Sequence, residues 1–269
     1  MMAKIDSKNP TLDLENQFYK SALLALRMEG IPFLVGGSFA FSHYTPIGRF
    51  TKDVDIFIEP ENSEKVLRLF SGRARTERTH SHWLIKIISK TGLYMDVIFN
   101  SGNGVCKVDR RWFDFSEPGK LLNVPVDFCP LEEMIWMKAY VMERDRFDGA
   151  DISHLIYHCA HRIHWNRLLE RFGSHWRVLL SHLVLFGFVY PDRRSQIPAF
   201  VMDTLLERLF REQFAQRITG QRICLGTLLS GIEYRHDLDE EGYMDPRLSP
   251  LGKMSSDQIE AWEKNLIHS

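Results

Sequence analysis

The stretch that most constrains the fold is FLVGGSFAFSHYTPIGRFTKDVDIFIEP, residues 33–60. Two glycines follow a short apolar run directly, and two aspartates, Asp53 and Asp55, stand two positions apart in a second apolar run. Placing carboxylates beside Val54 and Ile56 is unfavourable unless a cation meets them. We therefore expect a strand that carries a cation-binding site on one face.

The alternation of side chains along a strand places Asp53 and Asp55 on the same face, about 7 Å apart. A hard divalent cation relieves the repulsion between them, and Mg²⁺ is commonly held by one or two carboxylates together with substrate phosphates. The glycine turn and the helix expected after it, with Ser38 near its N-cap, offer backbone N–H groups that favour phosphate. Together these features outline a site for a metal ion and a phosphate.

A third carboxylate, Asp96, stands alone in the apolar run YMDVI. If this strand lies beside the strand of Asp53 and Asp55, three carboxylates can hold two metal ions. One ion would carry a triphosphate, and the other would lower the pKa of an attacking hydroxyl.

The organisation of the chain predicts an α+β fold with a helical C-terminal region. The first half reads as mixed α/β, with a hairpin whose turn is Lys90-Thr91-Gly92. From Pro130, a favourable first residue of a helix, the apolar spacing becomes helical. We expect a mixed β-sheet flanked by helices at residues 1–129, a helical domain at 130–229, and a polar tail with one short helix at 230–269.

Composition excludes several classes of protein. The formal net charge is −1, which argues against a protein that coats nucleic acid or membrane by bulk charge. The four cysteines lack CxxC spacing and read as free thiols in a reducing compartment. The first residues contain no apolar h-region, so we expect no secretory signal, and the longest apolar run, residues 178–191, is too short to span a bilayer. We expect a cytoplasmic protein with no membrane partner.

The order of these residues resembles the nucleotidyltransferase superfamily with a DNA polymerase β-like core. The signature of that superfamily is an apolar strand, Gly-Gly/Ser, a spacer, and D-x-D or D-x-E. The form R-x-T-x-D-x-D, from Arg49 to Asp55, looks most like the small bacterial branch. This branch contains antibiotic nucleotidyltransferases and the nucleotidyltransferase toxins of abortive-infection and toxin–antitoxin systems.

The resemblance implies an enzyme that moves an NMP from an NTP, expected to be ATP, to a hydroxyl or phosphate acceptor with Mg²⁺ or Mn²⁺. It implies that Asp53 and Asp55 bind the metals and that Asp96 completes the site and accepts the acceptor's proton. The turn of Gly36, Gly37 and Ser38 would hold the nucleotide phosphates. Fourteen residues separate Ser38 from Asp53, slightly more than the usual spacer, which weakens the assignment of Ser38.

Three cations are candidates for binding the triphosphate. Arg49 and Lys52 precede the carboxylates closely, but a solvated loop or a structural ion pair explains them as well. Lys138 lies in an apolar helix, where it either contacts phosphate or extends from a packed helix to solvent.

The acceptor stays open at this stage between a small molecule, tRNA and a protein. An acidic acceptor pocket could use Glu132, Glu133, Asp148 and Asp151, and a basic rim for RNA could use Arg73, Arg75 and Arg78. His154, His158 and His161 share a helical face, but packing explains them better than metal binding. The alternative function is a non-catalytic module of the same fold that binds an NTP or an antitoxin partner.

Overall fold

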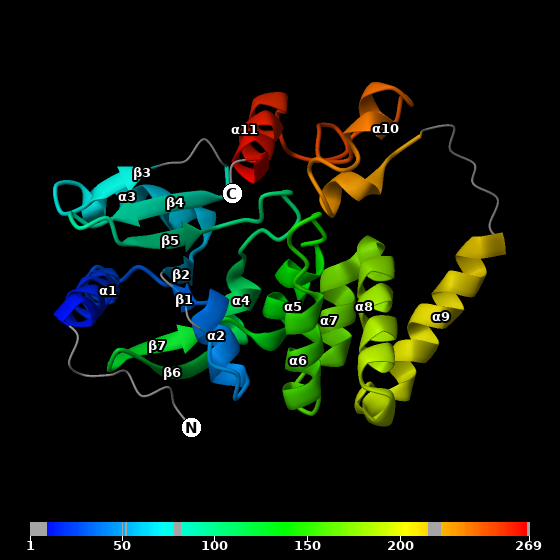
Figure 1. Cartoon of the computed structure of the whole chain (residues 1–269), viewed down its shortest axis with the longest axis horizontal. Helices are drawn as coiled ribbons and strands as arrows, with labels where there is room; N and C mark the ends of the chain where they lie inside the picture. The colour runs from blue at the N-terminus through cyan, green and yellow to red at the C-terminus, as the bar shows by residue number, and fades with distance from the viewer. Residues whose placement is uncertain (1–9, 50, 52, 78–81, 215–221, 268–269) are drawn as a thin grey trace. The chain divides into compact units, whose positions relative to one another are not determined.

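The computed structural model describes the whole chain except residues 1–9, 50, 52, 78–81, 215–221 and 268–269. The chain divides into two compact units, Met1–Pro130 and Leu131–Ser269. Figure 1 shows strands and helices in the first unit and helices in the second. The α+β fold class predicted from the sequence is confirmed.

The first unit contains a seven-stranded mixed sheet with the strand order β3-β4-β5-β2-β1-β7-β6 (Figure 1). Its strands are β1 (Leu34–Val35), β2 (Val54–Phe57), β3 (Arg75–Glu77), β4 (Leu84–Ile88), β5 (Tyr94–Ile98), β6 (Glu117–Leu121) and β7 (Val124–Phe128). The pairs β2–β5 and β1–β7 are parallel, and the other neighbours are antiparallel. The strand that carries Asp96 therefore lies directly beside the strand that carries Asp55.

The helical elements of this unit are α1 (Pro10–Met28), α2 (Gly37–Tyr44), η1 (Pro60–Asn62), α3 (Ser63–Phe70) and α4 (Arg110–Asp114). α1 buries Leu23 and Leu26 completely, and it contacts α3 and β7. It ends at Met28, and Gly30 follows with a φ of +66°, which suits a glycine after a helix C-terminus. In β2, Val54 and Ile56 are fully buried while Asp55 is half-buried, so the alternation predicted for this strand is present.

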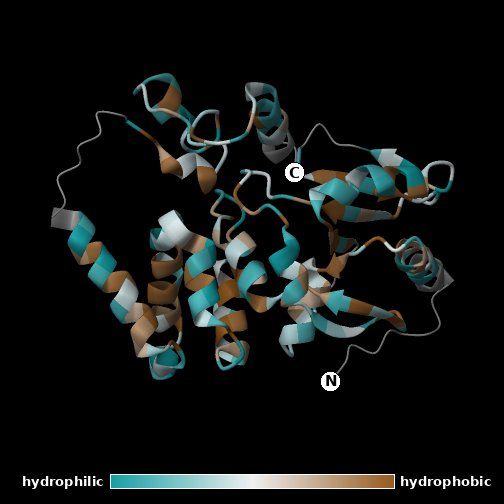
Figure 2. Cartoon of the chain, turned by 180° about the vertical axis from the view of Figure 1, so that it is seen from behind, coloured by the Kyte–Doolittle hydropathy of each residue, from teal (hydrophilic) through white to brown (hydrophobic). Residues whose placement is uncertain are grey.

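The second unit is helical. Its elements are α5 (Leu131–Ala139), α6 (Gly149–Cys159), α7 (Trp165–Phe172), η2 (Gly173–His175), α8 (Trp176–Val189), η3 (Pro191–Gln196), α9 (Ala199–Phe214), η4 (Leu225–Leu228), α10 (Arg235–Asp239) and α11 (Ser256–Ile267). α5 packs on α6, α7 and α8. α9 alternates hydrophilic and hydrophobic bands along its length, as expected for a helix with one packed face (Figure 2).

A charged network is buried between α5 and α7. Arg167 Nη1 donates to Glu132 Oε2 over 2.5 Å, and Arg171 Nε donates to Glu133 Oε1 over 2.7 Å. Arg167 also pairs with Glu133, which is completely buried. Burial raises the pKa of Glu133, while the two arginines act in the opposite direction. The first turn of α5 is therefore tied to α7 by ion pairs inside the helical core.

One helical stretch within the described residues, Trp165–Val189, is long and apolar enough to cross a membrane by length and composition. Core helices of globular proteins pass the same test. This stretch is longer than the apolar run at residues 178–191, because it also contains α7, η2 and the start of α8. The expectation of no membrane partner now depends on packing, since α8 buries Trp176, Leu179 and Leu183 and contacts α6, α7 and α9.

Candidate active site

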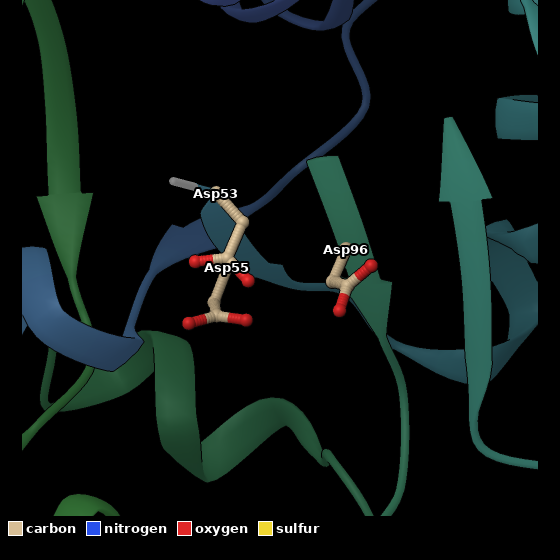
Figure 3. A group of neighbouring side chains, drawn as sticks. All are labelled: Asp53, Asp55 and Asp96. Carbon is tan, nitrogen blue, oxygen red and sulfur yellow. The ribbon is translucent and has the colours of Figure 1, made fainter. Parts of the chain in front are cut away.

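Three carboxylates converge at the centre of the sheet. Asp55 on β2 stands directly opposite Asp96 on β5 in the parallel register, and Asp53 immediately precedes β2. Each of the three offers a carboxylate oxygen within 4.8 Å of the others. Figure 3 shows their side chains gathered in one region, two from the β2 segment and one from β5. The condition set by the sequence, that the two strands lie side by side, is met. Asp53, Asp55 and Asp96 are called the acidic group below.

The members of the acidic group are half-buried and have partners of their own. The Thr51 hydroxyl donates to Asp53 Oδ1, and Tyr94 lies close to Asp53. Burial raises the pKa of Tyr94, and the charge of Asp53 raises it further. These contacts fix the position of Asp53 at the entry to β2.

Asp96 is held by a lysine that sequence reasoning missed. Lys86 on β4 is paired with Asp96 in the antiparallel register, and its Nζ lies 3.0 Å and 3.2 Å from the two oxygens of that carboxylate. Burial raises the pKa of Asp96, Lys86 lowers it in part, and the charge of Asp53 raises it. The signal was present in the sequence, because Lys86 is the one charged residue of the apolar run WLIKIIS.

The two glycines fit closely around the D-x-D strand. The Gly36 N–H donates to the Asp55 carbonyl oxygen over 2.9 Å, and a Cβ at Gly36 would lie 2.1 Å from the Phe57 ring. Gly37 has a φ of +53°, and a Cβ there would lie 1.7 Å from Asp55 Oδ2. The turn therefore leaves room for Phe57 and Asp55, a role that the sequence analysis did not assign to it.

α2 begins at Gly37, with Gly36 as its N-cap and no side chain capping it. Ser38 is the second residue of the helix, so it lies near the N-cap as predicted. The first N–H groups of a helix have no partner within it and carry partial positive charge. The start of α2 beside Asp55 therefore suits a phosphate group carried by a metal ion.

The predicted cations lie in different surroundings. The Arg49 guanidinium lies 4.4 Å from the centre of the Phe41 ring, while Lys52 is outside the described residues. Lys138 Nζ lies 3.0 Å from an oxygen of Asp148 and 2.6 Å from one of Asp151. Lys138 is thus bound within the helical unit, and its contact with nucleotide stays a prediction.

Several other candidates are settled by burial and by their neighbours. Glu132 and Glu133 lie in the core of the helical unit, so they are not available to line an acidic acceptor pocket. Among the residues that the structure describes, the acidic group is the only cluster of three or more His, Cys, Asp and Glu suited to a metal, and His154, His158 and His161 form no such cluster. In the proposed basic rim, Arg75 pairs with Glu77, and Arg78 is outside the described residues. All four cysteines are free thiols, as predicted.

No family model matches this sequence, and no curated protein matches it. Several solved structures match the fold at low identity and with TM-scores below 0.5. The lincosamide antibiotic adenylyltransferase LnuA with lincomycin bound is 16% identical, with a TM-score of 0.37 over 52% of this chain and 94% of that one. The antibiotic-resistance factor ANT(2'')-Ia is 17% identical, with a TM-score of 0.42 over 63% of this chain and 97% of that one.

A third match is an antigenic nucleotidyltransferase-like protein from Paracoccidioides brasiliensis, which is 13% identical, with a TM-score of 0.43 over 68% of this chain and 92% of that one. At such scores the chemical interpretation rests on the acidic group and the glycine turn rather than on overall likeness.

Proposed function

We propose that the chain is a metal-dependent nucleotidyltransferase that moves an NMP from an NTP, expected to be ATP, to a hydroxyl or phosphate acceptor. The observation that carries the proposal is the convergence of Asp53, Asp55 and Asp96 within 4.8 Å. Half-buried carboxylates this close repel one another unless cations compensate them. A non-catalytic module has no need of such a costly arrangement, so the convergence favours the enzyme.

The donor set fits Mg²⁺ or Mn²⁺, because these hard cations prefer carboxylate oxygens. Asp53 and Asp55 would bind the metal, with Asp96 completing the site. A divalent ion bound there would neutralise phosphate charge and activate the attacking oxygen. The site contains no cysteine or histidine among its described residues, which argues against a zinc-type site.

The protein's own groups have three tasks in this proposal. The start of α2, with Gly37 and Ser38, binds the nucleotide phosphates through backbone N–H groups. Arg49, which lies close to the D-x-D strand in sequence, adds positive charge for the triphosphate. Asp96 accepts the proton of an acceptor hydroxyl, a role for which a carboxylate with a raised pKa is suited. Positioning and charge neutralisation provide most of the catalysis in such transfers.

A label-transfer assay tests this function. The purified chain is mixed with Mg²⁺, one α-³²P-labelled NTP at a time, and fractions of small molecules, tRNA or protein. We expect label in one fraction, which names the acceptor class. Asp55→Asn should lower the transfer by roughly 100-fold or more, because it removes a metal ligand.

Asp127→Asn is the matched control, since Asp127 is an exposed aspartate on β7 of the same sheet and is not in the acidic group. It should leave transfer unchanged, and thermal unfolding should show that both variants are folded. Equal activity of Asp55→Asn and the wild type would refute the assigned site. Binding of NTP without transfer to any fraction would favour the non-catalytic module.

A further inference from the structure

Lys86 is the feature of the sheet that the proposed function does not use. Its Nζ contacts both oxygens of Asp96, so the ammonium group faces this carboxylate in the manner of a bound cation. The Nζ also lies 4.2 Å from the centre of the Tyr94 ring. The side chain is 27% exposed and that of Asp96 is 14% exposed, so water screens the pair only in part.

The backbone fixes this arrangement. Lys86 and Asp96 are directly opposite in the β4–β5 ladder, and Asp96 and Asp55 are directly opposite in the β5–β2 ladder. Directly opposite side chains on one face of a sheet lie close enough to interact. One row across three strands thus holds a cation and two carboxylates, and the cation is part of the chain.

The formal charges of these groups point to the number of metal ions. The acidic group carries −3 when ionised, and Lys86 reduces the sum for these four side chains to −2. A single divalent ion neutralises a charge of −2. Before any nucleotide binds, two divalent ions would leave the same group at +2, and the second would have to approach Asp96 against the charge of Lys86.

We propose that Lys86 takes the place of one of the two metal ions that three carboxylates can hold. The site then binds one divalent ion through Asp53 and Asp55, and Lys86 neutralises Asp96. This inference rests on the proposed function and refines it, because it assigns a positioning and charge-balancing role to a residue outside the D-x-D motif. It predicts a metal stoichiometry of one per chain.

Binding of Mn²⁺ to the full chain, counted from the electron paramagnetic resonance signal of free Mn²⁺, tests the inference without relying on activity. The wild type should bind one Mn²⁺ per chain. The affinity for a second Mn²⁺ should be at least about tenfold higher in Lys86→Met than in the wild type, because the substitution removes a positive charge in contact with Asp96. Lys86→Arg keeps the charge and should keep one ion per chain.

Lys90→Met is the matched control, because Lys90 is an exposed lysine in the turn of the same hairpin. It should bind one Mn²⁺, as the wild type does. Two tightly bound ions in the wild type, or no additional ion in a folded Lys86→Met variant, would overturn the inference and leave the nucleotidyltransferase proposal standing. No Mn²⁺ binding by the wild type, together with no label transfer, would overturn both.

Discussion

Replacing Gly37 with alanine tests whether the glycine turn is needed for Asp55 to reach the acidic group. Gly37 has a φ of +53°, and a Cβ there would lie 1.7 Å from Asp55 Oδ2. Ordinary van der Waals contact begins at 3.4 Å, so the carboxylate or the turn must move by about 3.4 − 1.7 = 1.7 Å. The substitution therefore acts on both the backbone and the site.

The two effects have different magnitudes and different readouts. The left-handed backbone conformation destabilises an alanine by about 1–2 kcal/mol, which lowers the free energy of unfolding. Displacement of Asp55 acts on activity, because misplacing a reacting or positioning group by about 1 Å can lower the rate by roughly 100-fold. We expect Gly37→Ala to lower label transfer by about 100-fold or more and to weaken Mn²⁺ binding.

Gly30→Ala separates strain from displacement. Gly30 has a φ of +66°, and a Cβ there would have nothing within 4 Å, so the variant carries the backbone strain without a clash. Both variants should lose similar stability in urea unfolding, but only Gly37→Ala should lose transfer and metal binding. Wild-type transfer by Gly37→Ala would show that this glycine does not set the position of Asp55, and the reasoning would fail.

Two further predictions concern the helical unit. Burial alone would raise the pKa of Asp148, but the charges of Lys138 and Arg146 hold it below its ordinary value of 3.8. Ionised Asp148 therefore stabilises the fold above pH 3.8. This contribution is lost as the pH falls through the lowered pKa. When the pH is lowered below 3.8, the free energy of unfolding should fall less for Asp148→Asn than for the wild type. An equal fall for the two proteins would contradict this prediction. Arg167→Met leaves Glu132 and Glu133 with fewer cations in the core and should lower the free energy of unfolding by about 3–5 kcal/mol in urea. Arg211→Met, which removes an exposed pair with Glu207, should change it by no more than about 0.5 kcal/mol, and equal losses would refute the role of burial.

The periodicity of the sequence predicts those parts of the fold that depend on side-chain alternation. The β4–β5 hairpin, the D-x-D strand β2 and the last helix α11 are where the pattern predicts them. The pattern does not reveal β6, because Pro118 and Gly119 weaken a strand signal. β6 tolerates Pro118 because it is the edge strand of the sheet. Its turn to β7 contains Leu122 at a positive φ, a residue that gives no turn signal.

The pairing of β2 with β5 is the step that sequence patterns could not decide, because the two strands are distant along the chain and parallel. The pairing of Lys86 with Asp96 is different, since a tight turn at residues 90–92 sets the register of the hairpin. Counting back from that turn places the lysine opposite the aspartate. Lys86 could therefore have been found from the sequence, by applying to a lone cation the same reasoning that singled out the lone Asp96.

The glycine turn shows why the order of the motif matters as much as its residues. The sequence suggests that Gly36 and Gly37 leave space for phosphate, whereas the structure places Phe57 and Asp55 against them. Both roles can hold at once, because the Gly36 N–H bonds the Asp55 carbonyl and so joins the start of α2 to β2. A phosphate at the start of α2 and a metal ion on Asp55 would then be placed by the same contact. The glycines and the aspartates act as one unit, so a change at either is expected to affect the binding of both ligands.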